Sequence, residues 1–400
     1  MIQQKSKKGA AIALACAAVF LGLIVLLENI SLLLPTTPSV LLPTSQLFVV
    51  LKKGAVYSLA AVSMNLLNGF TGLFSLGQAG FMLLGAYTYA ILSVPVADRA
   101  AVYYLYGGSA VNFSFQDMFG ALFGTEGLGG AVSMGLGVVV AMVLAGCVAA
   151  AFAYLIGLPV LRLKSDYLAI ATLGFAEIIK AVFQWQALGP VTNGANMIKN
   201  FPTFSSFNIT GPDGKTVILR LSVFFPFLVS MICITLIVML INSSYGRAFK
   251  AIREDEIAAE AMGINLAKHK MLSFCTSAFF AGISGAMFAM FVANAQAKVY
   301  TTTMTYEILL IVVIGGIGSI SGSVMATFLY VACSEWWLRF LDNEITLSNG
   351  MKLPLLRAGF RMVVFSIVIM IVVLFFRKGI MGDRELPDLF KKRRKKEAVQ

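Results

Sequence analysis

The chain has 400 residues, of which 58% are hydrophobic and 12% are charged. Ordinary soluble domains are about half apolar and about a quarter charged, so this composition excludes a soluble enzyme. The 31 Lys and Arg residues exceed the 19 Asp and Glu residues, which gives a net charge of +12. In a soluble protein that excess would suggest nucleic acid. In so apolar a chain, the expected partner is the lipid bilayer, and no nucleic-acid partner is expected.

Runs of about 19 apolar residues predict an all-α polytopic membrane protein with about ten transmembrane helices, within a range of eight to ten. The first run, at residues 10–27, is longer than the roughly 7 to 15 residues of a signal-peptide core, so we expect it to be retained. The other spans are predicted at 48–67, 76–94, 130–156, 168–185, 221–241, 271–293, 306–320, 323–341 and 358–376. A glycine-rich stretch interrupts the region 306–341, which forms either two short spans or a re-entrant pair.

Basic residues at the two ends set the expected orientation. Lys5, Lys7 and Lys8 precede the first span, and no further Lys or Arg follows until Lys52. The positive-inside rule places this end in the cytoplasm, and an even number of spans returns the C-terminus there. The basic tail at residues 391–400 agrees with this orientation, and residues 1–390 are expected to form one transmembrane domain.

The sequence gives no support for metal or disulfide chemistry. Each of the five cysteines stands alone in an apolar run, where a thiol usually packs as a small hydrophobic side chain. The single histidine, His269, lies between two lysines without the several converging ligands that a metal site needs. We therefore expect no metal, no other cofactor and no catalytic residue.

Two long loops are expected on the outer side. Residues 95–129 carry clustered Tyr and Phe, which form either an interfacial aromatic segment or a docking surface. Residues 187–220 are rich in turn-forming pairs such as Gly-Pro and Asn-Gly. The stretch 214–216 resembles the end of a phosphate-binding loop, but Ile209 occupies the position where a Walker A motif needs Gly. Any ATP must therefore be handled by another chain.

The loop at residues 243–270, between the sixth and seventh spans, is the most informative segment. Three acidic residues at 254–256 open a stretch of high helix propensity, and Gly263 is placed to end it. Acidic residues at the start of a helix and lysines beyond its end suit the helix dipole. The loop is therefore predicted to contain a short cytoplasmic helix.

Small residues distinguish this predicted helix, because small side chains allow another protein to approach closely. A solvated connecting helix is the alternative interpretation. The segment resembles the cytoplasmic EAA loop of bacterial ABC-importer permeases, in which Ala-rich residues followed by Gly dock on the ATPase subunit. The match is not letter for letter. It implies an ATPase-coupling role for Glu256, Ala258, Ala259, Glu260, Ala261 and Gly263.

Further segments resemble the M-type permease of the branched-chain amino-acid (Liv) importers. They lie at residues 72–81, 161–179, 251–258 and 315–319. The resemblance implies a permease subunit of an ATP-binding-cassette importer for branched-chain or other hydrophobic amino acids. It also implies the bacterial cytoplasmic (inner) membrane, with both termini cytoplasmic. The implied partners are a homologous second permease, two ABC ATPase subunits that hydrolyse the ATP, and an extracytoplasmic substrate-binding protein.

One stretch departs from the family pattern. After the fifth span the family usually carries Thr-Gly-Gly-x-x-Gly-Ile. This chain keeps Thr192, Gly194 and Ile198, but it has Asn193 and Met197 where Gly is expected. Both replacements restrict the backbone. A different amino acid, urea or a short amide is therefore an alternative cargo.

Two ionisable residues lie within the fifth span. Glu177 and Lys180 are three residues apart, so they share a helix face. Ionisable groups at that depth cost at least about 2.5 kcal/mol and usually face the bundle or a wet cavity. The pair is either an internal ion pair that holds helices together, or a gate or contact for the charges of a zwitterion.

Glycine-interrupted stretches at residues 68–80 and 315–322 are the other candidates for the pathway. In transporters, paired glycine-broken segments often mark the substrate site, where unwound backbone offers N–H and C=O groups. Small residues also simply let membrane helices pack. The substrate-pathway candidates are Ser75, Gln78, Glu177, Lys180, Thr192, Gly194, Glu307, Gly315, Gly316 and Gly318.

Two rival functions belong to other classes. A self-sufficient secondary transporter would use an ion gradient, with Glu177, Lys180 and Glu307 as its coupling charges. A membrane-embedded enzyme is the second, although no His cluster or metal motif supplies catalytic groups. The coupling-type loop favours the importer permease, because a secondary carrier has no need of an Ala-rich helix aimed at a motor.

Overall fold

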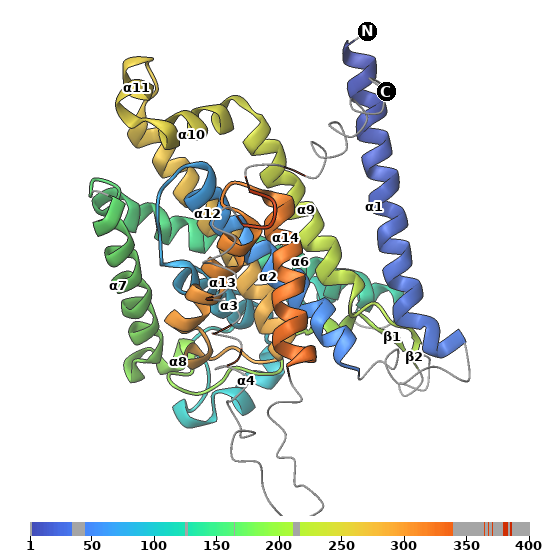
Figure 1. Cartoon of the computed structure of the whole chain (residues 1–400). Coiled ribbons are helices and arrows are strands. Elements are labelled where there is room, and N and C mark those ends of the chain that lie inside the picture. The colour runs from blue at the N-terminus through green and yellow to red at the C-terminus, as the bar shows by residue number, and fades with distance from the viewer. Residues whose placement is uncertain are drawn as a thin grey trace, which may run out of the picture.

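The computed structural model describes residues 2–33, 45–124, 127–163, 165–210, 217–338 and 379–382, and the single residues 364, 367, 370 and 385. The long helices form a bundle, with α1 (Ile2–Leu33) at its edge (Figure 1). Among the described residues, six helices are long and apolar enough to cross a membrane, and one bent pair would make a seventh. The predicted all-α polytopic membrane protein is confirmed.

Each of the first nine predicted spans overlaps helical structure. The tenth predicted span, 358–376, lies outside the described residues except for positions 364, 367 and 370. The tail 391–400 lies wholly outside them. The helices after α1 are α2 (Gln46–Asn65) with the π-helical turn η2 (Leu66–Phe70), α3 (Gln78–Ser93), α6 (Gly127–Val160), α7 (Ser165–Gln184), α9 (Phe224–Asn242), α12 (Leu266–Val292), α13 (Thr302–Gly315) and α14 (Ile320–Ala332) with the π-helical turn η7 (Cys333–Trp337).

The interrupted region that follows α12 forms two short helices. α13 and α14 have 14 and 13 residues, so each rises about 20 Å at 1.5 Å per residue. That is less than a hydrocarbon core of about 30 Å. A Cβ added at Gly315 would lie 2.6 Å from the carbonyl carbon of Gly322, so the pair is packed as tightly as its glycines allow.

The centre of the bundle is the crossing of α3 and α12, which α2 and α6 flank. A Cβ added at Gly85 would overlap the carbonyl of Gly282, and one at Gly285 would overlap the carbonyl of Met82. Small residues bring membrane helices close in this way, because dispersion contacts replace the hydrophobic effect inside lipid. This crossing is the closely packed core of the molecule.

The edge helix α1 is joined to the start of α9 by a buried carboxylate. Glu28 is 2% exposed and accepts hydrogen bonds from the Ser222 hydroxyl at 2.6 Å and the Val223 N–H at 3.0 Å. A buried charge is tolerated when its hydrogen bonds are satisfied. The N-terminal span is therefore part of the folded domain.

One end of the molecule carries short elements. They are α4 (Val96–Val102), η3 (Tyr104–Tyr106), α5 (Phe115–Phe123), η4 (Gln186–Leu188), α8 (Gly189–Thr192), η5 (Phe204–Phe207), β1 (Ile209–Thr210), β2 (Val217–Leu219) and, before α13, η6 (Ala297–Val299). The antiparallel pair β1–β2 lies in the turn-rich loop 187–220 and is a small departure from the all-α class. Arg99, 3% exposed, donates to the carbonyls of Ile91, Val111 and Phe113 at 2.5–2.7 Å and so ties the loop 95–129 to α3.

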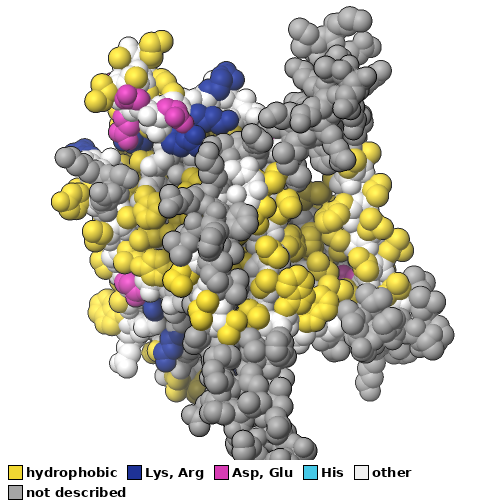
Figure 2. Space-filling model, in the orientation of Figure 1, with side chains coloured by type: hydrophobic (Ala, Val, Ile, Leu, Met, Phe, Trp, Pro, Cys, Tyr) yellow, Lys and Arg dark blue, Asp and Glu magenta, His cyan; other side chains and the backbone are white. Residues whose placement is uncertain are grey.

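The opposite end carries α10 (Ser244–Glu254) and α11 (Glu256–Ala261), and α1 begins at that same end (Figure 1). Figure 2 shows a broad band of hydrophobic side chains across the bundle, with a large group of charged side chains over α10 and α11 and a smaller group at the lower left. The apolar band has the distribution expected of a lipid-facing surface. The charged end lies outside it.

Candidate functional site

The short helix predicted in the loop 243–270 is present, but the loop holds two helices. α10 runs through Glu254, and Asp255 then adopts an extended conformation with φ −158°. Its carboxylate accepts hydrogen bonds from the N–H groups of Ile257 at 2.8 Å and Ala258 at 3.0 Å, which is the action of an N-cap. The predicted acidic start of the helix is confirmed for Asp255, which caps it, and Glu256, its first residue, whereas Glu254 ends α10.

Gly263 ends α11 as predicted. It has φ +83°, and its N–H donates to the carbonyl of Glu260 at 2.9 Å. The next N–H, of Ile264, reaches back to the carbonyl of Ala259 at 3.1 Å. These two bonds form a Schellman motif, which requires a left-handed residue at the position of Gly263. Both ends of α11 are therefore fixed by local interactions.

Most of α11 is exposed. Ile257 and Met262 are 82% and 83% exposed, whereas Ala259 is buried against the rest of the protein. The other predicted coupling residues, Glu256, Ala258, Glu260, Ala261 and Gly263, are exposed. Large apolar side chains that protrude beyond the apolar band, between small neighbours, are a feature of surfaces that bind another protein.

The base of the loop is firmly attached to the bundle. Phe249 and Ile252 on α10 are buried, and Lys270 on α12 pairs with Glu256 at 2.6 Å. His269 Nδ1 lies 2.8 Å from the carbonyl of Asn265, one helical turn back. Among the described residues there is no group of three or more potential metal ligands. The loop combines a buried base with an exposed tip.

The two glycine-interrupted stretches lie in contact with each other, since a Cβ added at Gly69 would lie 2.6 Å from the Gly318 nitrogen. The Asn65 side chain at the end of α2 accepts a hydrogen bond from the Gly318 N–H at 2.9 Å. Its amide group donates to the Ser319 carbonyl at 2.9 Å and the Ser323 hydroxyl at 2.8 Å. Residues more than 250 apart in the sequence are thereby joined by a single amide side chain. Spacing in the sequence did not predict this contact.

The turn that contains Gly316 and Gly318 is also covered by residues near the C-terminal end. Gly316 and Gly318 have φ +113° and +91°, which glycine adopts readily. The Ile380 N–H donates to the carbonyl of Ile314 at 2.7 Å, and the Glu385 carboxylate accepts from the Ile320 N–H at 2.7 Å. The turn is therefore held from two sides.

Ser75 and Gln78 lie inside the bundle and are engaged with protein groups. Gln78 donates to the Ser63 hydroxyl at 2.7 Å and to the Ala60 carbonyl at 3.2 Å. Ser75 is 5% exposed, and its hydroxyl accepts from the Gly77 N–H at 3.4 Å. These contacts fix the start of α3 against α2, as close packing requires.

Glu307 belongs to a separate charged group. Its carboxylate is hydrogen-bonded to Tyr330, near the ion pair of Lys53 and Glu335, whose Nζ and Oε1 lie 2.5 Å apart. Lys53 is missing from the predicted site residues. Its position inside the second predicted span is a detectable sequence feature, because a charge inside a span needs a partner.

Glu177 and Lys180 form an ion pair within one helix. Their Oε2 and Nζ atoms are 3.4 Å apart on α7, and the side chains are 47% and 22% exposed. The pair therefore does not bridge two helices in this chain. Gly174, Ile178 and Ala181 are exposed beside Glu177, on a helix at the edge of the bundle (Figure 1).

Thr192 and Gly194 lie at the end of the molecule that carries α4 and α8. The Thr192 hydroxyl donates to the Leu188 carbonyl at 3.1 Å and accepts from the Gly194 N–H at 3.2 Å. Asn193 between them has φ +57°, a conformation that Asn tolerates better than most residues. The replacement of Gly by Asn therefore leaves the left-handed turn in place.

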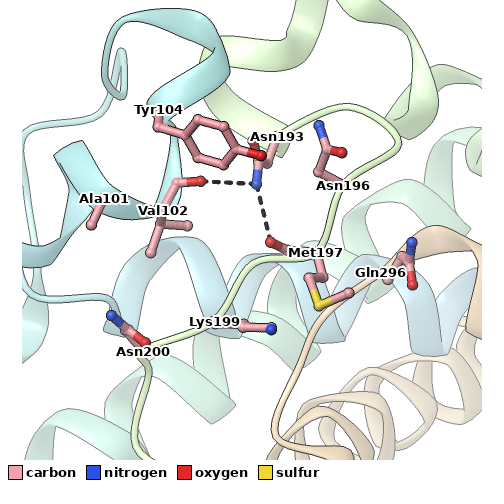
Figure 3. Close-up of a pocket in the computed structure, with 9 residues that line it drawn as sticks. All are labelled: Ala101, Val102, Tyr104, Asn193, Asn196, Met197, Lys199, Asn200 and Gln296. Atoms are coloured by element: carbon pink, nitrogen blue, oxygen red, sulfur yellow. Dashed lines mark hydrogen bonds between the residues drawn. The ribbon is translucent and has the colours of Figure 1, made fainter.

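A cavity of about 370 Å³ opens beside this turn (Figure 3). The Asn193 amide reaches across to the carbonyls of Val102 at 3.1 Å and Met197 at 3.0 Å. Burial raises the pKa of the nearby Tyr103 to about 12, and its hydroxyl lies 3.0 Å from the Val191 carbonyl. The lining residues are Ala101, Val102, Tyr104, Asn193, Asn196, Met197, Lys199, Asn200 and Gln296.

The ten predicted pathway residues thus do not form one site. They fall into the contact region of the glycine-interrupted stretches, the edge helix α7, the Glu307 group and the turn at Thr192. The sequence analysis did not identify Arg253, Asn65 or the polar residues that line the cavity. Their contacts join segments that are distant in the sequence.

Comparison with known proteins gives a consistent assignment. The model of the family described as branched-chain amino acid transport system, permease component, matches residues 46–374. The LivM high-affinity branched-chain amino acid transport system permease proteins of Salmonella typhimurium and Escherichia coli are each 30% identical, over 319 and 314 residues. These matches cover 74% of this chain and 64% of each relative.

A probable branched-chain amino acid transport permease protein LivM of Methanocaldococcus jannaschii is 22% identical over 342 residues, which is 83% of this chain and 92% of the relative. No solved structure matches the chain significantly. Because the family match covers most of the bundle described above, the chain belongs to the family of branched-chain amino acid transport permease components.

Proposed function

We propose that this chain is the permease subunit of an ATP-binding-cassette importer and forms part of the membrane pathway for branched-chain or other hydrophobic amino acids. Partner subunits hydrolyse the ATP. The observation that carries the proposal is α11, a short helix capped at both ends. Ile257 on the helix and Met262 at its C-cap are apolar and protrude at the charged end of the bundle. The names of the relatives favour branched-chain amino acids over urea or short amides.

The ATPase subunits bind α11 in this proposal. Ala258, Ala261 and Gly263 are small enough to let a groove close around the helix, while Glu256 and Glu260 flank it. Burying a side chain such as Ile257 or Met262 contributes about 1.5–3 kcal/mol, which is enough to anchor a partner at this point.

The homologous second permease covers the face of α7 that carries Glu177. A charged group at mid-depth in lipid costs about 2.5–3.5 kcal/mol, so this face does not turn toward the bilayer. The small neighbours Gly174 and Ala181 leave room for a second chain or for water. We place the pathway along this face, with Glu177 and Lys180 beside it.

The orientation follows from the coupling loop. The start of α1 lies at the same end as α10 and α11 (Figure 1), and ATPases act from the cytoplasm. The protein is thus a multi-pass protein of the bacterial cytoplasmic (inner) membrane, with both termini cytoplasmic. The end with α4, α8 and the cavity beside Asn193 then faces the extracytoplasmic substrate-binding protein.

An ion-coupled secondary transporter is less well supported. Its coupling charges would have to act together, yet Glu177 and Lys180 pair on α7 while Glu307 bonds Tyr330 on α14. An exposed, doubly capped helix has no part in such a mechanism.

Reconstitution distinguishes these functions. The chain is purified with the second permease and the ATPases encoded with it and placed in proteoliposomes, and the binding protein is added outside. We expect leucine uptake that needs internal ATP, stops with a non-hydrolysable analogue and is competed by isoleucine and valine. Uptake driven by an ion gradient without ATP would contradict the proposal, and competition by urea alone would reassign the cargo.

A further inference from the structure

Arg253 lies where the cytoplasmic loop meets the bundle. It is the second-last residue of α10, immediately before the extended Asp255 region that leads to α11. Its Nη1 donates a hydrogen bond to the carbonyl of Gly69 at 2.9 Å. Gly69 belongs to η2, the irregular turn in which the second span ends. A side chain of the loop therefore contacts the first glycine-interrupted stretch directly.

Two glycines provide the space for this side chain. A Cβ added at Gly72 would lie 2.9 Å from Arg253 Cγ, and one added at Gly318 would lie 2.9 Å from Arg253 Nη1. Both glycines have positive φ, +76° and +91°. Gly72 and Gly318 come from different glycine-interrupted stretches, so the Arg253 side chain, which is 31% exposed, lies against both of them.

Neighbouring contacts hold Arg253 in this position. Glu254 Oε1 accepts from Nη2 at 2.7 Å and from Nε at 3.2 Å, so the guanidinium is oriented by its neighbour. Lys250, one turn earlier, lies with its Nζ 5.6 Å from the centre of the Phe70 ring. The last turn of α10 is thus seated on η2 by two basic side chains.

The two segments beside Arg253 lack regular α-helix. Residues 71–77 form no helix between η2 and α3, and the turn 316–319 separates α13 from α14. Asn65, at the end of α2, bonds Gly318 and Ser319 of this turn, and a Cβ added at Gly69 would lie 2.6 Å from the Gly318 nitrogen. Backbone without a helical hydrogen-bond ladder moves at lower cost than the α3–α12 crossing. A displacement of Arg253 therefore acts on both segments together and leaves the core packed.

We propose that Arg253 is a positioning residue that transmits movement of α10 and α11 to the two glycine-interrupted stretches. The inference rests on the proposed importer function and deepens it by naming the route from the ATPase contact to the membrane pathway. Arg253 itself does not contact the cargo in this scheme. Through its contacts, η2 and the turn at Gly318 move together with the loop.

The test uses the complete importer in proteoliposomes and measures both ATP hydrolysis and leucine uptake. Arg253→Ala is expected to assemble and hydrolyse ATP but to lower the leucine imported per ATP by about tenfold, since a hydrogen bond to a charged group is lost. Arg253→Lys keeps the charge but not the fork of the guanidinium, and should lie between Ala and the parent. Arg162→Ala, an exposed arginine outside these contacts, is the matched control and should keep the parent ratio.

Hydrogen exchange in the parent complex supplies a second measurement, which does not depend on whether a variant folds. Binding of an ATP analogue should change exchange at residues 66–76 and 316–322 as well as in α11. In Arg253→Ala the change should be confined to the loop. An unchanged import ratio in Arg253→Ala, or a parent in which only α11 responds to nucleotide, would overturn the inference. A parent without ATP-driven uptake would instead refute the proposed function.

Discussion

Glu256 on α11 and Lys270 on α12 form an ion pair, with Oε2 and Nζ 2.6 Å apart. Lys270 is mostly buried, whereas the Glu256 side chain is half exposed. The pair links the tip of the loop to a helix of the central crossing. Partly exposed pairs contribute about 0.2–1 kcal/mol, so this one stabilises the position of α11 more than the fold.

We accordingly predict that Glu256→Gln leaves the melting temperature of the purified chain within about 2 °C of the parent but accelerates amide exchange in α11. High salt should reproduce part of the effect in the parent, because exposed ion pairs are screened. Glu260→Gln, on the same helix, is the control and should exchange like the parent. Equal acceleration in both variants would mean that the pair with Lys270 has no role.

Gly263 provides a prediction with a conformational control. Its φ of +83° is unfavourable for residues with a Cβ, although the space around it is open. Gly263→Ala should cost about 1–2 kcal/mol locally and reduce ATP-coupled uptake, and Gly263→Asp should reduce uptake by adding a charge to the exposed surface beside α11. Gly263→Asn should be close to the parent, because Asn tolerates this conformation without adding a charge. Normal coupling in Gly263→Asp would remove α11 from the coupling route.

The two ends of α11 show what local sequence can predict. Asp255 and Gly263 act through hydrogen bonds to residues no more than four positions away, so the position of the helix follows from a short segment. The division of the loop into α10 and α11 did not follow, since helix propensity is similar on both sides of Asp255. The break comes from the cap itself.

Arg253 and Asn65 show what local sequence cannot predict. Their partners are Gly69 and Gly318, 184 and 253 residues away, and no spacing rule connects positions so distant. Sequence reasoning identified both glycine-interrupted stretches as unusual. The fact that they touch, and that an arginine of the loop 243–270 lies against both, depends on how the whole bundle packs.

The α3–α12 crossing gives a stability prediction. Gly85→Ala should destabilise the protein by about 1–3 kcal/mol or more. The new methyl group would overlap backbone atoms, which cannot move aside by a change of rotamer as a side chain can. Thermal unfolding in detergent should record this as a drop of several degrees, together with reduced abundance in the membrane. Gly135→Ala on α6, where nothing lies within 4 Å of the new Cβ, is the control. A parent-like melting temperature for Gly85→Ala would show that the crossing is looser than its contacts indicate.

Glu177 allows the pathway role to be separated from a structural one. The carboxylate pairs only with Lys180 among the described residues, on its own helix, so its removal breaks no link between helices of this chain. Glu177→Gln should therefore leave membrane abundance and assembly near the parent while it lowers uptake by about tenfold or more, as expected for a charge that faces a wet pathway. Lys180→Gln is the companion variant, and a larger loss for Glu177→Gln than for Lys180→Gln would assign the direct contact to the carboxylate. If abundance and uptake fell by the same factor in Glu177→Gln, the pair would have only a structural role, and the pathway would have to be sought away from the exposed face of α7.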